Sequence, residues 1–154
     1  MSPYERLAAL GLALPPSPEP VGNFLTQVAA GSGSLMFLSG QGPREADGSL
    51  HTGKVGAEVS VEAAYAHARL TGLNLLAVLH QALGDLGRVR RLVKLLGFVN
   101  AVPDFAAHPA VVNGCSDLFV EIFGERGRHA RSAIGVGSLP GNISVEIEAV
   151  FEVD

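Results

Sequence analysis

The sequence has 154 residues, of which 47% are hydrophobic and only 17% are charged. A chain of this length buries about two-thirds of its unfolded surface in one core, so a single domain is expected. The net charge of -4 argues against a nucleic-acid partner, because nucleic-acid binders need a basic face that neutralises phosphates.

The scarcity of charged residues predicts an oligomer, since a subunit interface would cover the apolar excess that a monomer would expose. The single cysteine, Cys115, excludes an intramolecular disulfide and suits a reducing compartment. Residues Met1 to Leu14 lack a basic leader, and no stretch reaches the ~18 uncharged apolar residues of a membrane span. We therefore expect a cytoplasmic protein that has no membrane partner.

The N-terminal third predicts a short helix, a tether and a hairpin. Tyr4–Leu12 favours a helix, and the cluster of four prolines that follows must be extended because proline cannot continue a helix. Phe24–Ala30 and Ser34–Ser39 suit strands, with a glycine-rich turn between them. A further short strand is expected at His51–Val55.

The remainder of the chain predicts two long helices and three strands. Apolar residues recur at helical spacing over Val61–Leu83, and a second helix is expected over Pro109–Phe123. Arg88–Val99 is rich in Val, Leu and Phe and predicts a mostly buried strand. Ser132–Val136 and Ser144–Val153 predict the last two strands, the second of which alternates apolar and polar residues.

Interleaved strands and helices around one sheet predict an α/β fold. We expect an α+β two-layer sandwich in which a mixed sheet packs on two long helices, with a short N-terminal helix added. Residues 1–20 would form this helix and its proline-rich tether, and residues 21–154 would form a single domain.

Most motifs have an ordinary structural interpretation. The Gly-x-Gly fragments are followed neither by a full dinucleotide fingerprint nor by a Walker lysine. The five histidines show no short ligand spacing, so no metal site is expected. Cys115 lies on an apolar helical stripe and is expected to be a buried thiol. The basic run from Arg88 to Lys94 predicts a solvated strand edge rather than an RNA contact.

Arg131 and Glu146 are the candidates for chemistry. An arginine just before a strand of small residues can bind a ligand carboxylate with its fork of donors, although spacing alone favours a surface ion pair with Asp117 or Glu121. Glu146 lies on the polar face of an amphipathic strand, which is normal for a half-solvated strand. Beside a guanidinium in a partly enclosed cleft, however, such a carboxylate could hold and polarise a water molecule.

Four segments, taken in order, resemble the RidA/YjgF family of reactive-intermediate deaminases. They are Leu38-Ser39-Gly40-Gln41-Gly42-Pro43, Asn113, Ala130-Arg131-Ser132 with Leu139-Pro140, and Val145-Glu146-Ile147-Glu148. Together they cover most of the chain from Phe24 to Val153. The N-terminal helix and tether resemble the branch named YjgF-like putative endoribonucleases, which has a chorismate-mutase-like fold.

The resemblance implies a homotrimer with helices outside a barrel-like wall and with clefts between adjacent subunits. Active deaminases of the family hydrolyse small enamine or imine carboxylates, such as 2-aminoacrylate, to 2-keto acids and ammonia. By resemblance, Arg131 clamps the substrate carboxylate, Glu146 positions the hydrolytic water and Asn113 lines the cleft. No cofactor and no metal are expected.

This sequence departs from the family pattern at three positions. Ala133 stands where many members have a cysteine, although a backbone contact to the ligand would survive this change. Phe24 replaces a tyrosine near the first strand, which removes a hydroxyl from the cleft, and Ser116 stands where an aromatic residue is common. Two other functions therefore stay open: a non-catalytic module that binds small carboxylates, and an endoribonuclease, which the family naming alone suggests.

Overall fold

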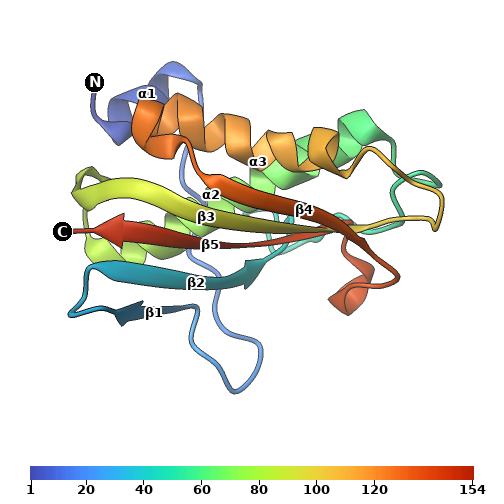
Figure 1. The fold of residues 1–154 in the computed structure, drawn as a ribbon, viewed down its shortest axis with the longest axis horizontal. Helices are drawn as coiled ribbons and strands as arrows, with labels where there is room; N and C mark the ends of the chain where they lie inside the picture. The colour runs from blue at the N-terminus through green and yellow to red at the C-terminus, as the bar shows by residue number, and fades with distance from the viewer.

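Two long helices cover one face of a five-stranded sheet in the computed structural model, which describes residues 1–154 (Figure 1). α2 (Val61–Leu83) begins where the Ser60 side chain accepts a hydrogen bond from the first turn, and it ends at Gly84 in a left-handed conformation. α3 (His108–Phe123) has a proline in its first turn, where the missing N–H costs nothing. The predicted two-layer α+β sandwich is confirmed.

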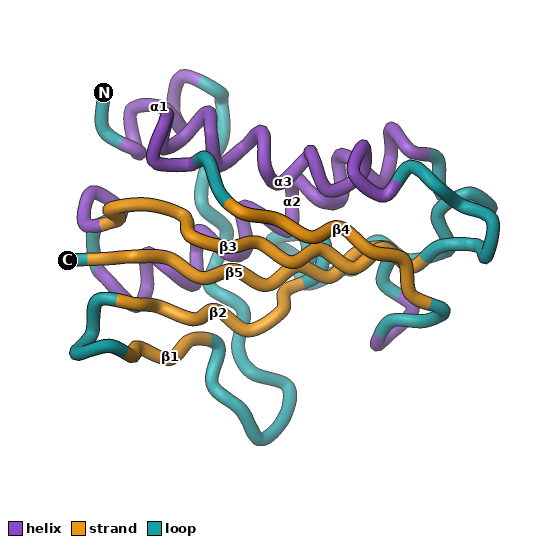
Figure 2. The backbone as a smooth tube through the Cα atoms, viewed as in Figure 1, coloured by secondary structure: helices purple, strands orange, loops and turns teal.

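The sheet is mixed and has the strand order β1-β2-β5-β3-β4 (Figure 2). Neighbouring strands are antiparallel except β3 and β4, which run parallel and are joined by α3, since a parallel pair needs a crossover. β4 and β1 are therefore the two edge strands. The strand bounds are β1 (Gln27–Ala30), β2 (Leu35–Gln41), β3 (Val89–Asn100), β4 (Ala130–Val136) and β5 (Val145–Val153).

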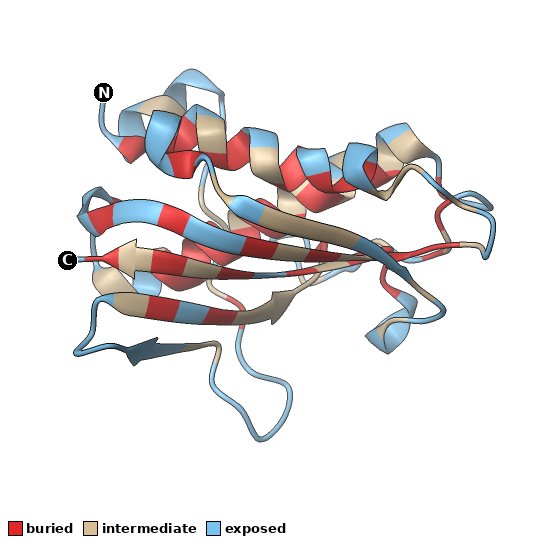
Figure 3. Ribbon diagram, in the orientation of Figure 1, coloured by how far each residue is buried: buried red, intermediate tan, exposed pale blue.

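The alternation of side chains on the central strand β5 separates the two faces of the sheet. Glu146 and Glu148 point away from the helices. Phe151 packs edge-to-face on Phe119 of α3, with ring centroids 5.7 Å apart. Figure 3 shows the buried residues gathered between the sheet and the helices. The helix-facing, buried residues of β5 are Val145, Ile147, Ala149, Phe151 and Val153.

The backbones of α2 and α3 lie close together at Gly114 of α3. A Cβ atom added there would lie 2.0 Å from the backbone carbonyl oxygen of Tyr65 on α2. We predict that Gly114→Ala destabilises the protein by about 3 kcal/mol or more, because backbone cannot yield as a flexible side chain does. Thermal unfolding would measure this loss. Gly137→Ala is the control, since an added Cβ there meets nothing within 4 Å; equal melting temperatures for the two variants would contradict the prediction.

The N-terminal helix α1 (Pro3–Ala9) begins at a capping box formed by Ser2 and Glu5. It packs against the C-terminal end of α3, where the Arg6 guanidinium donates a hydrogen bond to the Glu121 carbonyl oxygen at 3.2 Å. The Tyr4 hydroxyl accepts one from the Leu86 backbone N–H at 2.8 Å. The helix is thus attached to the helical layer, and the tether after it passes to the sheet edge at β1 (Figure 2).

The prediction of a strand at His51–Val55 is wrong. Only isolated bridges form in this region, including Thr52 to Ile143. Gly53, inside the expected strand, has a φ angle of 118°, and Gly56, directly after it, has a φ angle of 94°, so the backbone leaves the extended conformation that a strand requires. The first strand also starts at Gln27 instead of Phe24.

Cys115 is fully buried, and burial raises the pKa of its thiol well above the usual range, as expected of a structural cysteine. No helix combines the length and the apolar character needed to cross a membrane.

Candidate functional site

Arg131 lies on the edge strand β4 and points toward the helical layer. It pairs in register with Leu95, a fully buried residue of β3. Its Nη1 atom donates hydrogen bonds to Asn113 Oδ1 at 2.7 Å and to Ser116 Oγ at 3.1 Å, both on α3. The structure therefore brings together two predicted site residues, Arg131 and Asn113, which are 18 positions apart in the sequence.

The prediction from spacing alone, that Arg131 forms a surface ion pair with Asp117 or Glu121, is wrong. Glu121 instead pairs with Arg69 at 2.6 Å, and the Asp117 carboxylate accepts a hydrogen bond from the Tyr65 hydroxyl at 2.7 Å. No carboxylate lies within 4.0 Å of the Arg131 guanidinium. Its charge is held in place by neutral groups and remains available to an anion.

A second layer of side chains supports the contact with Ser116. Its hydroxyl lies 2.9 Å from His129 Nε2, and His129 Nδ1 lies 2.6 Å from the Gly127 carbonyl oxygen. Burial lowers the pKa of His129, and the Arg131 charge lowers it further, although the bond to Gly127 opposes this shift. The sequence analysis assigned no role to His129. Residues two positions apart in an extended chain point to the same side, and this spacing could have linked His129 to Arg131.

Ala133 follows Arg131 by two positions and is half-buried on the same side of β4. It pairs in register with Gly97 of β3. Because β4 is an edge strand, part of its backbone N–H and C=O groups is not used by the sheet. A backbone contact to a ligand at Ala133 is therefore compatible with the fold.

Glu146 lies in a different place, a pocket of about 530 Å³ at the end of β2. A Cβ atom added to Gly40 would lie 2.9 Å from Glu146 Oε2, so a glycine there makes room for the carboxylate across β2. Burial raises the pKa of Glu146, and the nearby Glu148 charge raises it further. Such a carboxylate takes up and releases a proton closer to neutral pH than an exposed one does.

The N-terminal tether forms one wall of this pocket. Pro18, Pro20 and the half-exposed ring of Phe24 line it together with the glycine-rich end of β2. Phe24 thus accompanies Glu146, and it brings an apolar ring without a hydroxyl.

A single chain does not bring Arg131 and Glu146 together. Glu146 is opposite Phe98, and Phe98 is opposite Ile134, so Arg131 lies three residues farther along β4 and two strands away. That spacing corresponds to roughly 10 Å along the strands and roughly 10 Å across them. The two side chains also leave opposite faces of the sheet, since Arg131 contacts α3 and Glu146 alternates with residues buried under the helices.

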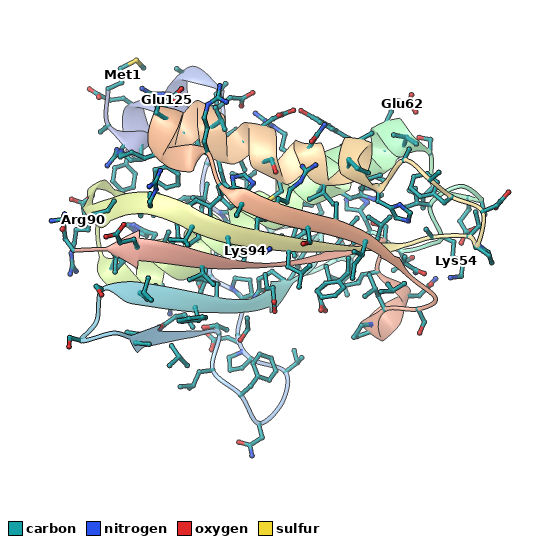
Figure 4. All side chains as sticks on the ribbon, in the orientation of Figure 1. Met1, Lys54, Glu62, Arg90, Lys94 and Glu125 are labelled. Carbon is teal, nitrogen blue, oxygen red and sulfur yellow. The ribbon has the colours of Figure 1, made fainter.

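The structure contains no group of three or more His, Cys, Asp or Glu side chains that could hold a metal ion. Lys54, labelled in Figure 4, donates hydrogen bonds to Asn100 Oδ1 at 2.9 Å and to the Gly137 carbonyl oxygen at 2.5 Å. Its ammonium group therefore connects the loop that contains Lys54 to the C-terminal ends of β3 and β4.

Comparison with known proteins finds similarity over nearly the whole chain. The model of the family described as YjgF/chorismate mutase-like, putative endoribonuclease matches residues 4–151. Protein TCP17 of Trypanosoma cruzi is 42% identical over 149 residues, which are 96% of this chain and 92% of that protein.

Solved structures are similar over a comparable length. Protein Atu1372 of Agrobacterium tumefaciens, described as of unknown function, is 43% identical with a TM-score of 0.91 over 99% of this chain and 92% of that one. A putative endoribonuclease from Shewanella oneidensis is 36% identical with a TM-score of 0.95 over 99% and 100%. RidA from the Antarctic bacterium Psychrobacter sp. is 27% identical with a TM-score of 0.62 over 89% and 94%.

Proposed function

Because the chain belongs to the YjgF/RidA family, we propose that it is a hydrolytic deaminase of small imine or enamine carboxylates, such as 2-aminoacrylate. The observation that carries this proposal is the state of Arg131, whose guanidinium is held by neutral side chains and lacks an ion-pair partner. A carboxylate bound there would form charge-assisted hydrogen bonds, which are about twice as strong as neutral ones.

In the proposed reaction, Glu146 holds a water molecule and accepts one of its protons as the oxygen attacks the C=N carbon. Glu146 returns this proton to nitrogen, which gives a carbinolamine. The C–N bond then breaks as the hydroxyl proton of the carbinolamine moves to nitrogen, so that ammonia leaves and the C=O bond of the 2-keto acid forms. An enamine such as 2-aminoacrylate enters this reaction after it has tautomerised to the imine. Burial supports this role, because a carboxylate whose pKa is raised toward neutrality is better matched to both accepting and returning a proton. The reaction needs no oxidant and no cofactor.

We further propose that the site is shared between subunits of a homotrimer. Arg131 and Glu146 leave opposite faces of one sheet, so a ligand can reach both only if they come from different chains. In a closed ring of head-to-tail contacts, each cleft would combine Arg131, Asn113 and Ala133 of one subunit with Glu146 and Phe24 of the next.

The helix-free face of the sheet supports this assembly. Val28, Phe37 and Ile134 on this face are 51%, 46% and 44% exposed, and a groove of about 250 Å³ runs between β1, β2, β5 and β3. Lys94, labelled in Figure 4, lies over the same face. Exposed apolar residues gathered in this way are typical of a surface that another subunit covers. Light scattering should give three times the mass of the chain, and a monomeric mass would contradict the shared cleft.

Imine hydrolysis tests the activity directly. An amino-acid oxidase would generate 2-imino acids with several different side chains, and their disappearance would be followed with and without the protein. We expect the protein to accelerate their conversion to 2-keto acids. The absence of acceleration for every imine would contradict the proposed deaminase.

A module that binds small carboxylates without converting them is the second candidate. The observation that favours it is Phe24, which places a ring but no hydroxyl in the Glu146 pocket. A 2-keto acid that raises the melting temperature, together with unchanged imine lifetimes, would select this function over the deaminase. An endoribonuclease has no such support, because the candidate site offers only two arginines, Arg131 and the Arg44 that lines the Glu146 pocket, and these do not form a basic patch that could follow a phosphate backbone.

A further inference from the structure

The Arg131 guanidinium is attached to α3 through only one of its two terminal nitrogens. Nη1 donates to Asn113 at 2.7 Å and to Ser116 at 3.1 Å. A guanidinium nitrogen of this kind carries two hydrogens, so these two bonds use both. Nε and Nη2, which share another edge of the planar group, form no hydrogen bond within the chain.

The direction of the bonds behind Ser116 follows from their last acceptor. A carbonyl oxygen only accepts, so the His129 Nδ1 atom, 2.6 Å from the Gly127 oxygen, must carry a hydrogen. In the neutral ring, which burial favours, Nε2 is then the acceptor. The Ser116 hydroxyl must donate to Nε2 at 2.9 Å, and this turns a lone pair of its oxygen toward Arg131.

We propose that Ser116 and His129 are positioning residues that, together with Asn113, fix the plane of Arg131 so that its Nε–Nη2 edge alone faces the ligand. The site would then bind a free, planar carboxylate side-on and would reject esters and amides of the same acids. This inference rests on the proposed function, in which Arg131 holds the substrate carboxylate.

Fixing the Arg131 guanidinium before the ligand arrives lowers the entropic cost of binding the ligand carboxylate. Arginine is a long side chain, and ordering it at the moment of binding costs on the order of 1 kcal/mol of rotamer entropy. The bonds to Asn113 and Ser116 order it before the ligand arrives. Loss of the Ser116–His129 pair should therefore weaken carboxylate binding and raise KM, whereas kcat at saturation should change little.

The test is titration of pyruvate, as an unreactive carboxylate, into the full-length protein and its variants. Ser116→Ala and His129→Leu should each weaken binding by about tenfold, the effect of one hydrogen bond. Ser116→Thr keeps the hydroxyl and His129→Gln keeps an acceptor, so both should bind nearly as the unaltered protein does. Alanine is favourable inside a helix, so Ser116→Ala is not expected to unfold α3.

A double-mutant cycle distinguishes positioning from simple packing. In the presence of Ser116→Ala, the further change His129→Leu should have almost no effect on pyruvate binding, because its route to Arg131 is already broken. Independent tenfold losses that multiply would overturn the proposal. The ring nitrogen chemical shifts of His129 provide a readout without ligand, and an Nε2–H tautomer at neutral pH would also overturn it.

The outcomes separate this inference from the proposed function. Loss of pyruvate binding in Arg131→Ala with unchanged binding in Ser116→Ala and His129→Leu would refute the positioning role and leave the function standing. If the unaltered protein neither binds pyruvate nor hydrolyses imines, the proposed function is wrong, and the inference falls with it.

Discussion

Arg131→Ala should lower kcat/KM for imine hydrolysis by about a hundredfold, because two charge-assisted hydrogen bonds to the substrate carboxylate are lost. The side chain lies at the edge of the sheet and contacts only Asn113 and Ser116 among polar groups, so the fold and the assembly should survive. Steady-state kinetics and light scattering on the same preparation would measure both effects.

Two further variants make this experiment specific. Arg131→Lys keeps the positive charge but cannot present two parallel donors, so we expect a loss close to that of alanine. Arg128→Ala is the matched control, since this arginine is three positions away and 70% exposed, and its only partner is Glu125. Undiminished turnover in Arg131→Ala, or an equal loss in Arg128→Ala, would contradict the assigned role of Arg131.

Glu146→Gln should lower kcat by at least about a hundredfold and leave KM nearly unchanged, because the amide keeps the shape of the side chain but cannot accept a proton. The variant should keep the melting temperature of the unaltered protein, since Glu146 forms no hydrogen bond or ion pair within the chain. A kcat within a few-fold of the unaltered protein would show that another group activates the water.

The pH dependence of kcat tests whether Glu146 acts in its deprotonated form. A base acts when deprotonated, so activity should rise with pH through the pKa of Glu146, which burial and the Glu148 charge raise above its usual value. Glu148→Gln removes one of these two causes and should move the acidic limb of the profile to lower pH. A limb that moves to higher pH, or that persists in Glu146→Gln, would assign the titration to a different group.

Local patterns were enough to predict most of the elements. The bounds of α2 follow from Ser60, which caps its first turn, and from Gly84, which ends it. The alternation of β5 predicted both its extent and the direction of Glu146. These signals involve residues within a few positions of one another. The prediction of a strand at His51–Val55 was wrong because it rested on the same kind of local signal. Whether this segment joins the sheet depends on distant segments such as Ile143, with which it forms only isolated bridges.

The sequence by itself thus determined the α+β sandwich, its two long helices and the identity of Arg131, Asn113 and Glu146 as candidates. Only the tertiary structure decided on which face of the sheet each of these residues lies and which side chains it contacts. Strand order and register place Arg131 and Glu146 on opposite faces, and packing of α3 on β4 links Arg131 to Ser116 and His129. The physical reason is that periodicity records which way a side chain points relative to its own element, whereas the neighbours it meets depend on how distant elements pack.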